Sequence, residues 1–408
     1  MPLSSSLIPQ YFTNNFSFTQ TNVIKKERII GLDVIRSIAI LMVVTAHSIG
    51  FLTRLGNVPF LGKIISVVVD HIQPLGLFGV ELFFVLSGFL IGGILIKAFI
   101  SADDFPFSAV RNFWVRRWYR TLPNYWLILT VDVFLYKAMN LQGFDPHQLL
   151  YYFFLQNLWY PDVLNFFGEG WSLSIEEWFY LTLPVAMYLA ALIFKPGNKR
   201  LFLLRVFAGY ISVFILIRFF NAFSPVNGAN QEEGIRKVVL FRLDAVMFGV
   251  LFAYFNYFRS DLLVKVKKYL LVIGLCGTAI LFYLVSKRDL EFRSSSNPSI
   301  RFVSDALLYL FIPLFFSFCL PYANSIKALT NKYGSNAVQH ISKISYSMYL
   351  VHYSLVFLPF FYEQQVNSGG MVVAMYLWYW IIVIGVSSLL YKYFERPVMN
   401  LRDKFSRQ

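Results

Sequence analysis

The sequence has few charged residues and almost no cysteine. Asp, Glu, Lys and Arg make up 14% of the 408 residues, whereas a soluble protein carries about 25%. Both cysteines, Cys276 and Cys319, lie within apolar segments, so neither a disulfide framework nor a Cys/His metal site is expected. The sequence also lacks a GxxxxGK(S/T) phosphate loop, a GxGxxG fingerprint, a GxSxG serine elbow and the HxxxxD pair of glycerolipid acyltransferases. We therefore expect no metal and no permanently bound cofactor.

Apolar residues dominate instead, at 57% of the chain, and aromatic residues make up 19%. Several apolar runs reach the length that an α-helix needs to cross a membrane, about 17 residues or more. We therefore predict an all-α polytopic membrane protein. The net charge of +14 is assigned to loops that face anionic lipid, and not to nucleic-acid binding. About ten transmembrane helices are predicted, near residues 31–53, 75–99, 122–137, 174–194, 202–221, 238–257, 269–286, 303–320, 343–361 and 371–392.

One further apolar segment, residues 149–160, is too short to span and is predicted to be re-entrant or interfacial. A full span there would reverse the sides of the later loops. The distribution of Lys and Arg favours ten spans with both termini in the cytoplasm. On this basis residues 1–30 form a polar cytoplasmic tail without a signal peptide. Residues 31–393 form one transmembrane domain, and residues 394–408 form a basic cytoplasmic tail.

The first predicted span carries three polar residues, Asp33, Arg36 and His47. Arg36 and His47 are eleven positions apart, so they lie on one helix face about 16 Å apart along the axis. Ionisable groups inside a membrane usually face a bundle interior or a watery cavity, and they are candidates for function. The alternative is that Arg36 extends to the membrane surface while His47 makes a structural bond between helices.

The most basic stretch of the chain contains Arg111, Arg116, Arg117 and Arg120, with Trp114 and Trp118 between them. Guanidinium groups bind phosphates bidentately and aromatic rings can stack on a base. This chemistry suits a nucleotide-bearing anion such as coenzyme A. The alternative is charge that only orients the protein in the membrane.

Two adjacent carboxylates, Glu176 and Glu177, begin a later span. Adjacent helical residues point about 100° apart, so at most one of them faces His47. We predict that Glu176 does so, because a carboxylate bonded to an imidazole fixes its tautomer and stabilises its charged form. The alternative is a pair exposed among the outer lipid headgroups.

Other polar residues within the spans have simpler interpretations. Arg242 and Asp244 are expected to neutralise each other. Ser87, followed by glycine, is expected to mark a close approach of two helices, with a serine nucleophile as the less favoured alternative. His352 is expected either to have a structural role or to line the site.

The stretches that contain these residues resemble the acyltransferase 3 family of integral membrane acyltransferases. LDVIRSIAILMVVTAHS is similar to the family's Arg-x10-His signature, and GVELFFVLSGFLIG to its second helix. FWVRRWYRTLP is similar to its RxxR–Pro region, WSLSIEEWFY to its WSLxxE segment, and FRLDAVMFGVL to a further element. ISYSMYLVHY and YFERP resemble its last two helices. These stretches follow the family's order from about residue 29 to 398.

The resemblance implies an enzyme of the cell membrane, namely the bacterial inner membrane. It takes an acyl group, commonly acetyl, from cytoplasmic acyl-CoA. The acceptor is a hydroxyl on a surface or lipid-linked carbohydrate. His47 is expected to be the general base, or to carry the acyl group in a relay, with Glu176 beside it. Arg36, Arg116, Arg117 and Arg120 are expected to bind the coenzyme A phosphates. Some members carry a C-terminal extracytoplasmic SGNH-type domain, and only about ten residues follow YFERP here. We therefore expect either direct transfer or a separate extracytoplasmic partner.

Two other functions remain open. Ten spans with polar stripes equally suit a transporter or flippase of a lipid-linked sugar, which would move its substrate without consuming coenzyme A. A membrane-bound O-acyltransferase of another fold would use similar histidine chemistry, but the Arg-x10-His and WSLxxE stretches argue against it.

Overall fold

The computed structural model describes residues 28–57, 59–102, 104–140, 145–161, 166–195, 197–223, 232–286, 306–362, 364 and 368–405. Secondary structure within these ranges is helical, and no strand occurs in them. The all-α prediction is therefore confirmed for the described part of the chain. The predicted tail 1–30 lies almost entirely outside it.

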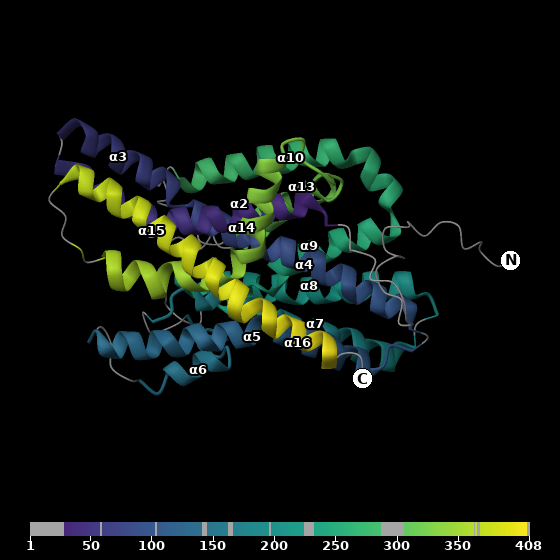
Figure 1. The fold of residues 1–408 in the computed structure, drawn as a ribbon. Helices are drawn as coiled ribbons and strands as arrows, with labels where there is room; N and C mark the ends of the chain where they lie inside the picture. The colour runs from purple at the N-terminus through teal and green to yellow at the C-terminus, as the bar shows by residue number, and fades with distance from the viewer. Residues whose placement is uncertain are drawn as a thin grey trace.

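In chain order the helices are α2 (Ile30–Ser48), η2 (Ile49–Asn57), α3 (Pro59–Ile72), α4 (Leu75–Ser101), α5 (Phe107–Ala138), α6 (Gln148–Tyr152), α7 (Gly170–Phe194), α8 (Lys199–Phe223), η3 (Glu232–Arg236), η4 (Val239–Phe241), α9 (Leu243–Phe258), α10 (Ser260–Ser286), α13 (Leu308–Asn324), α14 (Lys332–Val351), η6 (His352–Tyr362), α15 (Gly369–Leu390), η7 (Tyr391–Glu395) and α16 (Arg396–Phe405). Many of the long helices lie along one direction, close to the horizontal of Figure 1, with α3 toward one end and α16 toward the other.

Seven helices in the described residues are long and apolar enough to cross a membrane, which supports a multi-pass membrane protein. Each of the ten predicted spans falls on a helix, but the count of ten is not confirmed. Helices α9 and α13 are apolar but shorter than the others. Helix α5 has 32 residues, and its first half carries the basic residues of the RRWYR stretch.

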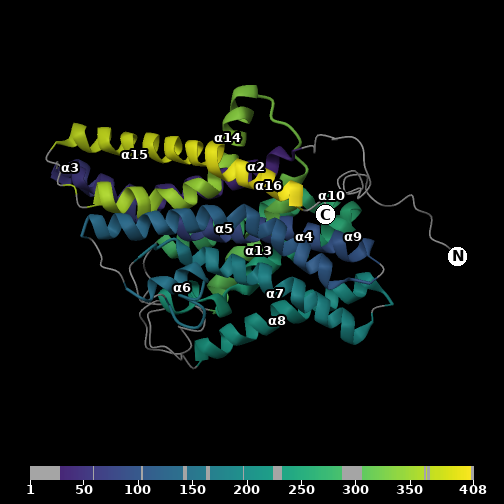
Figure 2. The ribbon, with the colours of Figure 1, turned by 60° about the horizontal axis from the view of Figure 1, so that its bottom comes forward.

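Two predicted non-spanning segments are clarified by the structure. In the stretch 149–160 the only helix is α6, which has five residues and cannot span a membrane. The predicted C-terminal tail is helical where it begins, since η7 and α16 continue α15. Helix α16 packs against α5. Figure 2 shows α16 beside α5. Glu395 at the end of η7 is buried.

The core of the bundle is the contact between α4 and α9, with α2 on the other side of α4. Glycines let the backbones approach. A Cβ on Gly88 would lie 1.9 Å from the Val246 carbonyl oxygen, and one on Gly249 would lie 2.0 Å from the Val85 carbonyl oxygen. Lipid tails are as apolar as leucine, so helices in a membrane associate through this close van der Waals packing. The close approach expected beside Ser87 is confirmed at Gly88.

We predict that Gly249→Ala lowers the melting temperature of the purified protein in detergent, because the added methyl group forces α4 and α9 apart. Overpacking of this kind costs about 1–3 kcal/mol. The matched control is Gly209→Ala in α8, where a Cβ meets nothing within 4 Å and alanine favours the helix by about 1 kcal/mol. Equal melting temperatures for the two variants would contradict the assigned packing.

Candidate functional site

Five of the residues singled out in the sequence line one cavity of about 140 Å³. It lies between α2, α4, α5, α7 and α14, and its polar wall includes three guanidiniums and one carboxylate. These residues are Arg36, Ser87, Arg117, Arg120 and Glu176. The apolar wall comes mainly from α4, and Tyr346 and Tyr349 contribute from α14. We call this space the arginine cavity. Arg116 is not among its lining residues.

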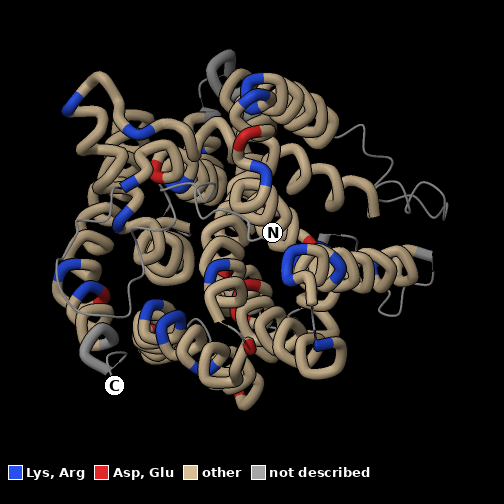
Figure 3. The backbone as a smooth tube through the Cα atoms, turned by 90° about the vertical axis from the view of Figure 1, so that its right-hand side faces the viewer, with Lys and Arg blue, Asp and Glu red and all other residues tan. Residues whose placement is uncertain are grey.

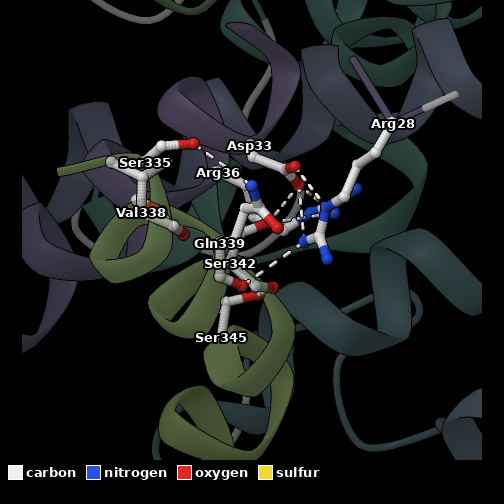
Figure 4. Close-up of polar contacts among 9 residues, drawn as sticks. Arg28, Asp33, Arg36, Ser335, Val338, Gln339, Ser342 and Ser345 are labelled. Carbon is white, nitrogen blue, oxygen red and sulfur yellow. Dashed lines mark hydrogen bonds and ion pairs between the residues drawn. The ribbon is translucent and has the colours of Figure 1, made fainter. Parts of the chain in front are cut away.

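Asp33 fixes the α2 side of the arginine cavity (Figure 4). Its carboxylate accepts hydrogen bonds from Arg28, with Nη2 at 2.9 Å from Oδ1, and from Ser342 Oγ at 2.6 Å. Arg36 lies one turn further on, with Nη1 3.8 Å from the Asp33 carboxylate and 3.4 Å from Ser342 Oγ. Asp33 therefore holds α14 against α2 and provides a counter-ion for Arg36.

Arg117, Tyr180 and Glu176 form a second network in the same cavity. Arg117 Nη2 donates to the Tyr180 hydroxyl at 2.6 Å, and its guanidinium lies 4.2 Å from the centre of the tyrosine ring. The Tyr180 hydroxyl donates to Glu176 Oε2 at 2.9 Å. The Tyr180 hydroxyl has only one proton, and the bond to Glu176 uses it. Ser87 Oγ is therefore the donor in the contact between Ser87 and Tyr180. The two hydroxyls and the carboxylate thus hold Arg117 at one position in the cavity.

This network corrects the prediction for Glu176. The carboxylate faces Arg117, at 3.8 Å, and not His47, because the neighbour of α7 at this depth is the basic half of α5. Tyr180 was not predicted. Its position four residues after Glu176 places both on one helix face, and that spacing was the available signal.

His47 instead contacts His352. His47 Nδ1 and His352 Nε2 are 2.8 Å apart, and the rings are stacked with centroids 5.1 Å apart. The Tyr353 ring covers His47 at 4.8 Å. Tyr349 lines the arginine cavity and also contacts the His352 ring at 5.7 Å. The histidine pair is therefore linked to the arginine cavity through Tyr349. His47 does make the bond between helices that the structural interpretation expected.

Arg242 and Asp244 were expected to neutralise each other, and the structure shows that this prediction is wrong. Arg242 pairs with Glu81 from α4, and Asp244 pairs with Arg218 from α8 at 2.7 Å. All four side chains are fully buried. Arg242 precedes α9 as its N-cap while Asp244 lies inside it, so the two side chains meet different neighbours. Neither residue lines the arginine cavity, which indicates a structural role.

We predict that Glu81→Met strongly destabilises the protein, because it leaves the Arg242 guanidinium buried without its counter-ion. Breaking such a pair costs about 3–5 kcal/mol, whereas replacing both partners by apolar residues is often neutral. The double variant Glu81→Met, Arg242→Met should therefore melt closer to the wild type than either single variant. Additive losses in detergent melting curves would contradict this interpretation.

Comparison with known proteins adds three findings. The acyltransferase 3 family model, described as an acyltransferase domain, matches residues 29–393. The O-acetyltransferase OatA of Staphylococcus aureus strain NCTC 8325 is 27% identical over 361 residues, which cover 82% of this chain and 55% of the relative. A putative O-acetyltransferase of strain COL is 26% identical over 359 residues, with the same coverage. The chain thus spans about half the length of the curated relatives it matches. No solved structure matches it.

Proposed function

The chain belongs to the acyltransferase 3 family, and on that premise we propose that it is a membrane O-acetyltransferase. It transfers an acetyl group from acyl-CoA to a hydroxyl of a surface or lipid-linked carbohydrate. One observation carries the proposal: a cavity lined by three guanidiniums has Tyr349 in its wall, and the Tyr349 ring contacts a histidine, His352, that faces His47. The names of the relatives, both O-acetyltransferases, support the reaction type.

The arginine cavity is the proposed entry of the donor. Arg36, Arg117 and Arg120 outnumber the single lining carboxylate, Glu176, so the cavity attracts an anion. Its volume of about 140 Å³ is well below the range of about 300–1,000 Å³ that is usual for small-molecule pockets. We infer that it admits the narrow pantetheine arm. The phosphates then lie against the guanidiniums, and the nucleotide stays at the mouth.

His47 is the proposed general base. It lies about 16 Å along α2 from Arg36, a distance that the extended pantetheine arm can bridge. His47 takes the proton of the acceptor hydroxyl as its oxygen attacks the thioester carbonyl. The tetrahedral intermediate then expels the coenzyme A thiolate, and the imidazolium returns the proton to that sulfur. General base catalysis of this kind is worth about 10²–10⁴-fold in rate.

The proposed orientation places the mouth of the arginine cavity on the cytoplasmic side of the cell membrane. Lys and Arg are spread over the end of the bundle that Figure 3 faces, and Asp and Glu are fewer there. An excess of basic residues marks the cytoplasmic ends of membrane helices. The donor is then taken from the cytoplasm. The acceptor, and any extracytoplasmic partner, meets the acetyl group from the other side.

The test uses the full chain in liposomes and follows acetyl-CoA binding and the release of free thiol. We expect His47→Ala to bind acetyl-CoA as the wild type does but to lose turnover. Arg117→Ala and Arg120→Ala each remove a charged hydrogen bond of about 1.5–3 kcal/mol. They should therefore weaken binding about tenfold to more than a hundredfold.

The matched control is Arg205→Ala, because Arg205 is exposed on α8 and does not line the arginine cavity. It should bind and turn over the donor normally. Substantial turnover by His47→Ala would overturn the assignment of the base. A wild type without affinity for any acyl-CoA would favour the transporter of a lipid-linked sugar.

A further inference from the structure

We propose that His352 is a positioning residue that accepts the Nδ1–H of His47 and so leaves Nε2 of His47 as the nitrogen that takes the acceptor's proton. The inference rests on the proposed function, because it specifies how the base of that reaction is held. It assigns a reacting atom that neither the sequence nor the family match identifies. Four features of the structure lead to it.

The first feature is the surroundings of His352 Nδ1. This nitrogen lies 2.8 Å from the Tyr349 carbonyl oxygen and 3.1 Å from the Met348 carbonyl oxygen. A carbonyl oxygen can only accept a hydrogen bond, so Nδ1 carries the proton. In a neutral imidazole the other nitrogen then has a free lone pair. His352 Nε2 is therefore an acceptor.

The second feature is the contact between the rings. Since His352 Nε2 accepts, the proton in the 2.8 Å contact belongs to His47 Nδ1. The neutral His47 must then have its lone pair on Nε2. Two backbone carbonyls of α14 thus determine, through His352, which nitrogen of a histidine on α2 is basic.

The third feature is the rigidity of His352. Its side chain is fully buried, so water does not compete for Nε2. It is the first residue of the π-helix η6, which continues α14 directly. The Tyr379 hydroxyl donates to the His352 carbonyl oxygen at 3.2 Å, and Ser354 Oγ donates to Glu169 Oε2 at 2.5 Å. These bonds hold η6 against α15 and the start of α7.

The fourth feature is that the hydrogen-bond partner of His47 is an imidazole and not a carboxylate. A carboxylate would stabilise the imidazolium that forms during the reaction. A neutral imidazole orients His47 without adding a counter-charge. The proton is then returned more readily to the departing thiolate, as the transfer requires.

The first experiment determines the tautomer directly, without turnover. The chain has only five histidines, so nitrogen spectra of ring-¹⁵N-histidine protein in bilayers can be assigned by single substitutions. We expect His47 to carry its proton on Nδ1 in the wild type and to lose this preference in His352→Ala. A wild-type His47 protonated on Nε2 overturns the inference, whether or not the protein is active.

The second experiment compares two amide substitutions of His352. The amide of His352→Gln ends where Nε2 lies and can accept from His47, whereas that of His352→Asn ends near Nδ1 and cannot. With acetyl-CoA hydrolysis as the assay, we expect Gln to retain kcat within about tenfold. Asn and Ala should lose about 10²-fold, the usual effect of a misplaced catalytic group, with KM for acetyl-CoA unchanged. His340→Ala, which alters a histidine bonded to Ser388 on α15, is the control and should behave as the wild type.

The outcomes separate this inference from the proposed function. Loss of turnover in His47→Ala together with normal turnover in His352→Ala overturns the inference and leaves the function standing. Normal turnover in His47→Ala overturns the assignment of the base, and with it this inference. A wild type without affinity for any acyl-CoA overturns the function, and the nitrogen spectra still decide the tautomer. A His352→Gln variant as inactive as Ala, with wild-type melting temperature and donor affinity, also overturns the positioning role.

Discussion

The cost of placing charge inside a membrane-spanning bundle determines where this protein can have a functional site. A buried charge is tolerated when it is paired and hydrogen-bonded. The Arg242–Glu81 and Arg218–Asp244 ion pairs are formed by four fully buried side chains, so no ligand reaches them. Arg117 and Glu176 are also paired, yet each side chain keeps 16% exposure and lines a cavity. The functional candidates therefore differ from the structural pairs in whether a ligand can reach them, and not in whether they carry charge.

The register between α2 and α14 connects the two ends of the candidate site. Ser342, Ser345, Tyr349 and His352 follow one another at intervals of three or four residues, so they lie on one face of the helix. Ser342 contacts Asp33 and Arg36 at one end, and His352 contacts His47 at the other. Because both helices run the same way between these contacts, a shift of one turn would break both. The Asp33–Ser342 bond therefore helps to set the histidine pair, although it lies at the other end of the helix.

Much of the fold and part of the site could be predicted from the sequence. Apolar length located the helices, and the eleven-residue interval placed Arg36 and His47 on one face. The partners could not be predicted in the same way. Glu176 and His47 were expected to meet because a carboxylate can fix the tautomer of an imidazole, but the partner of Glu176 is Arg117 from α5. Arg242 and Asp244 are two residues apart and pair with two other helices. Periodicity gives the direction of a side chain relative to its own helix, whereas a partner depends on how helices pack.

The position of Glu176 has a consequence for an empty donor site. Without a donor, Arg117 would be a poorly solvated cation within the bundle, and Glu176 and the Tyr180 hydroxyl supply its partners. If Glu176 had bonded His47 instead, Arg117 would lose the carboxylate with which it forms its ion pair, and the cavity would be costlier to maintain before the donor arrived. A phosphate arriving at Arg117 takes over this role, since a charge-assisted bond to phosphate is at least as strong as the one it replaces. The carboxylate therefore stabilises the cavity for the donor, and the orientation of His47 is left to a neutral partner, His352.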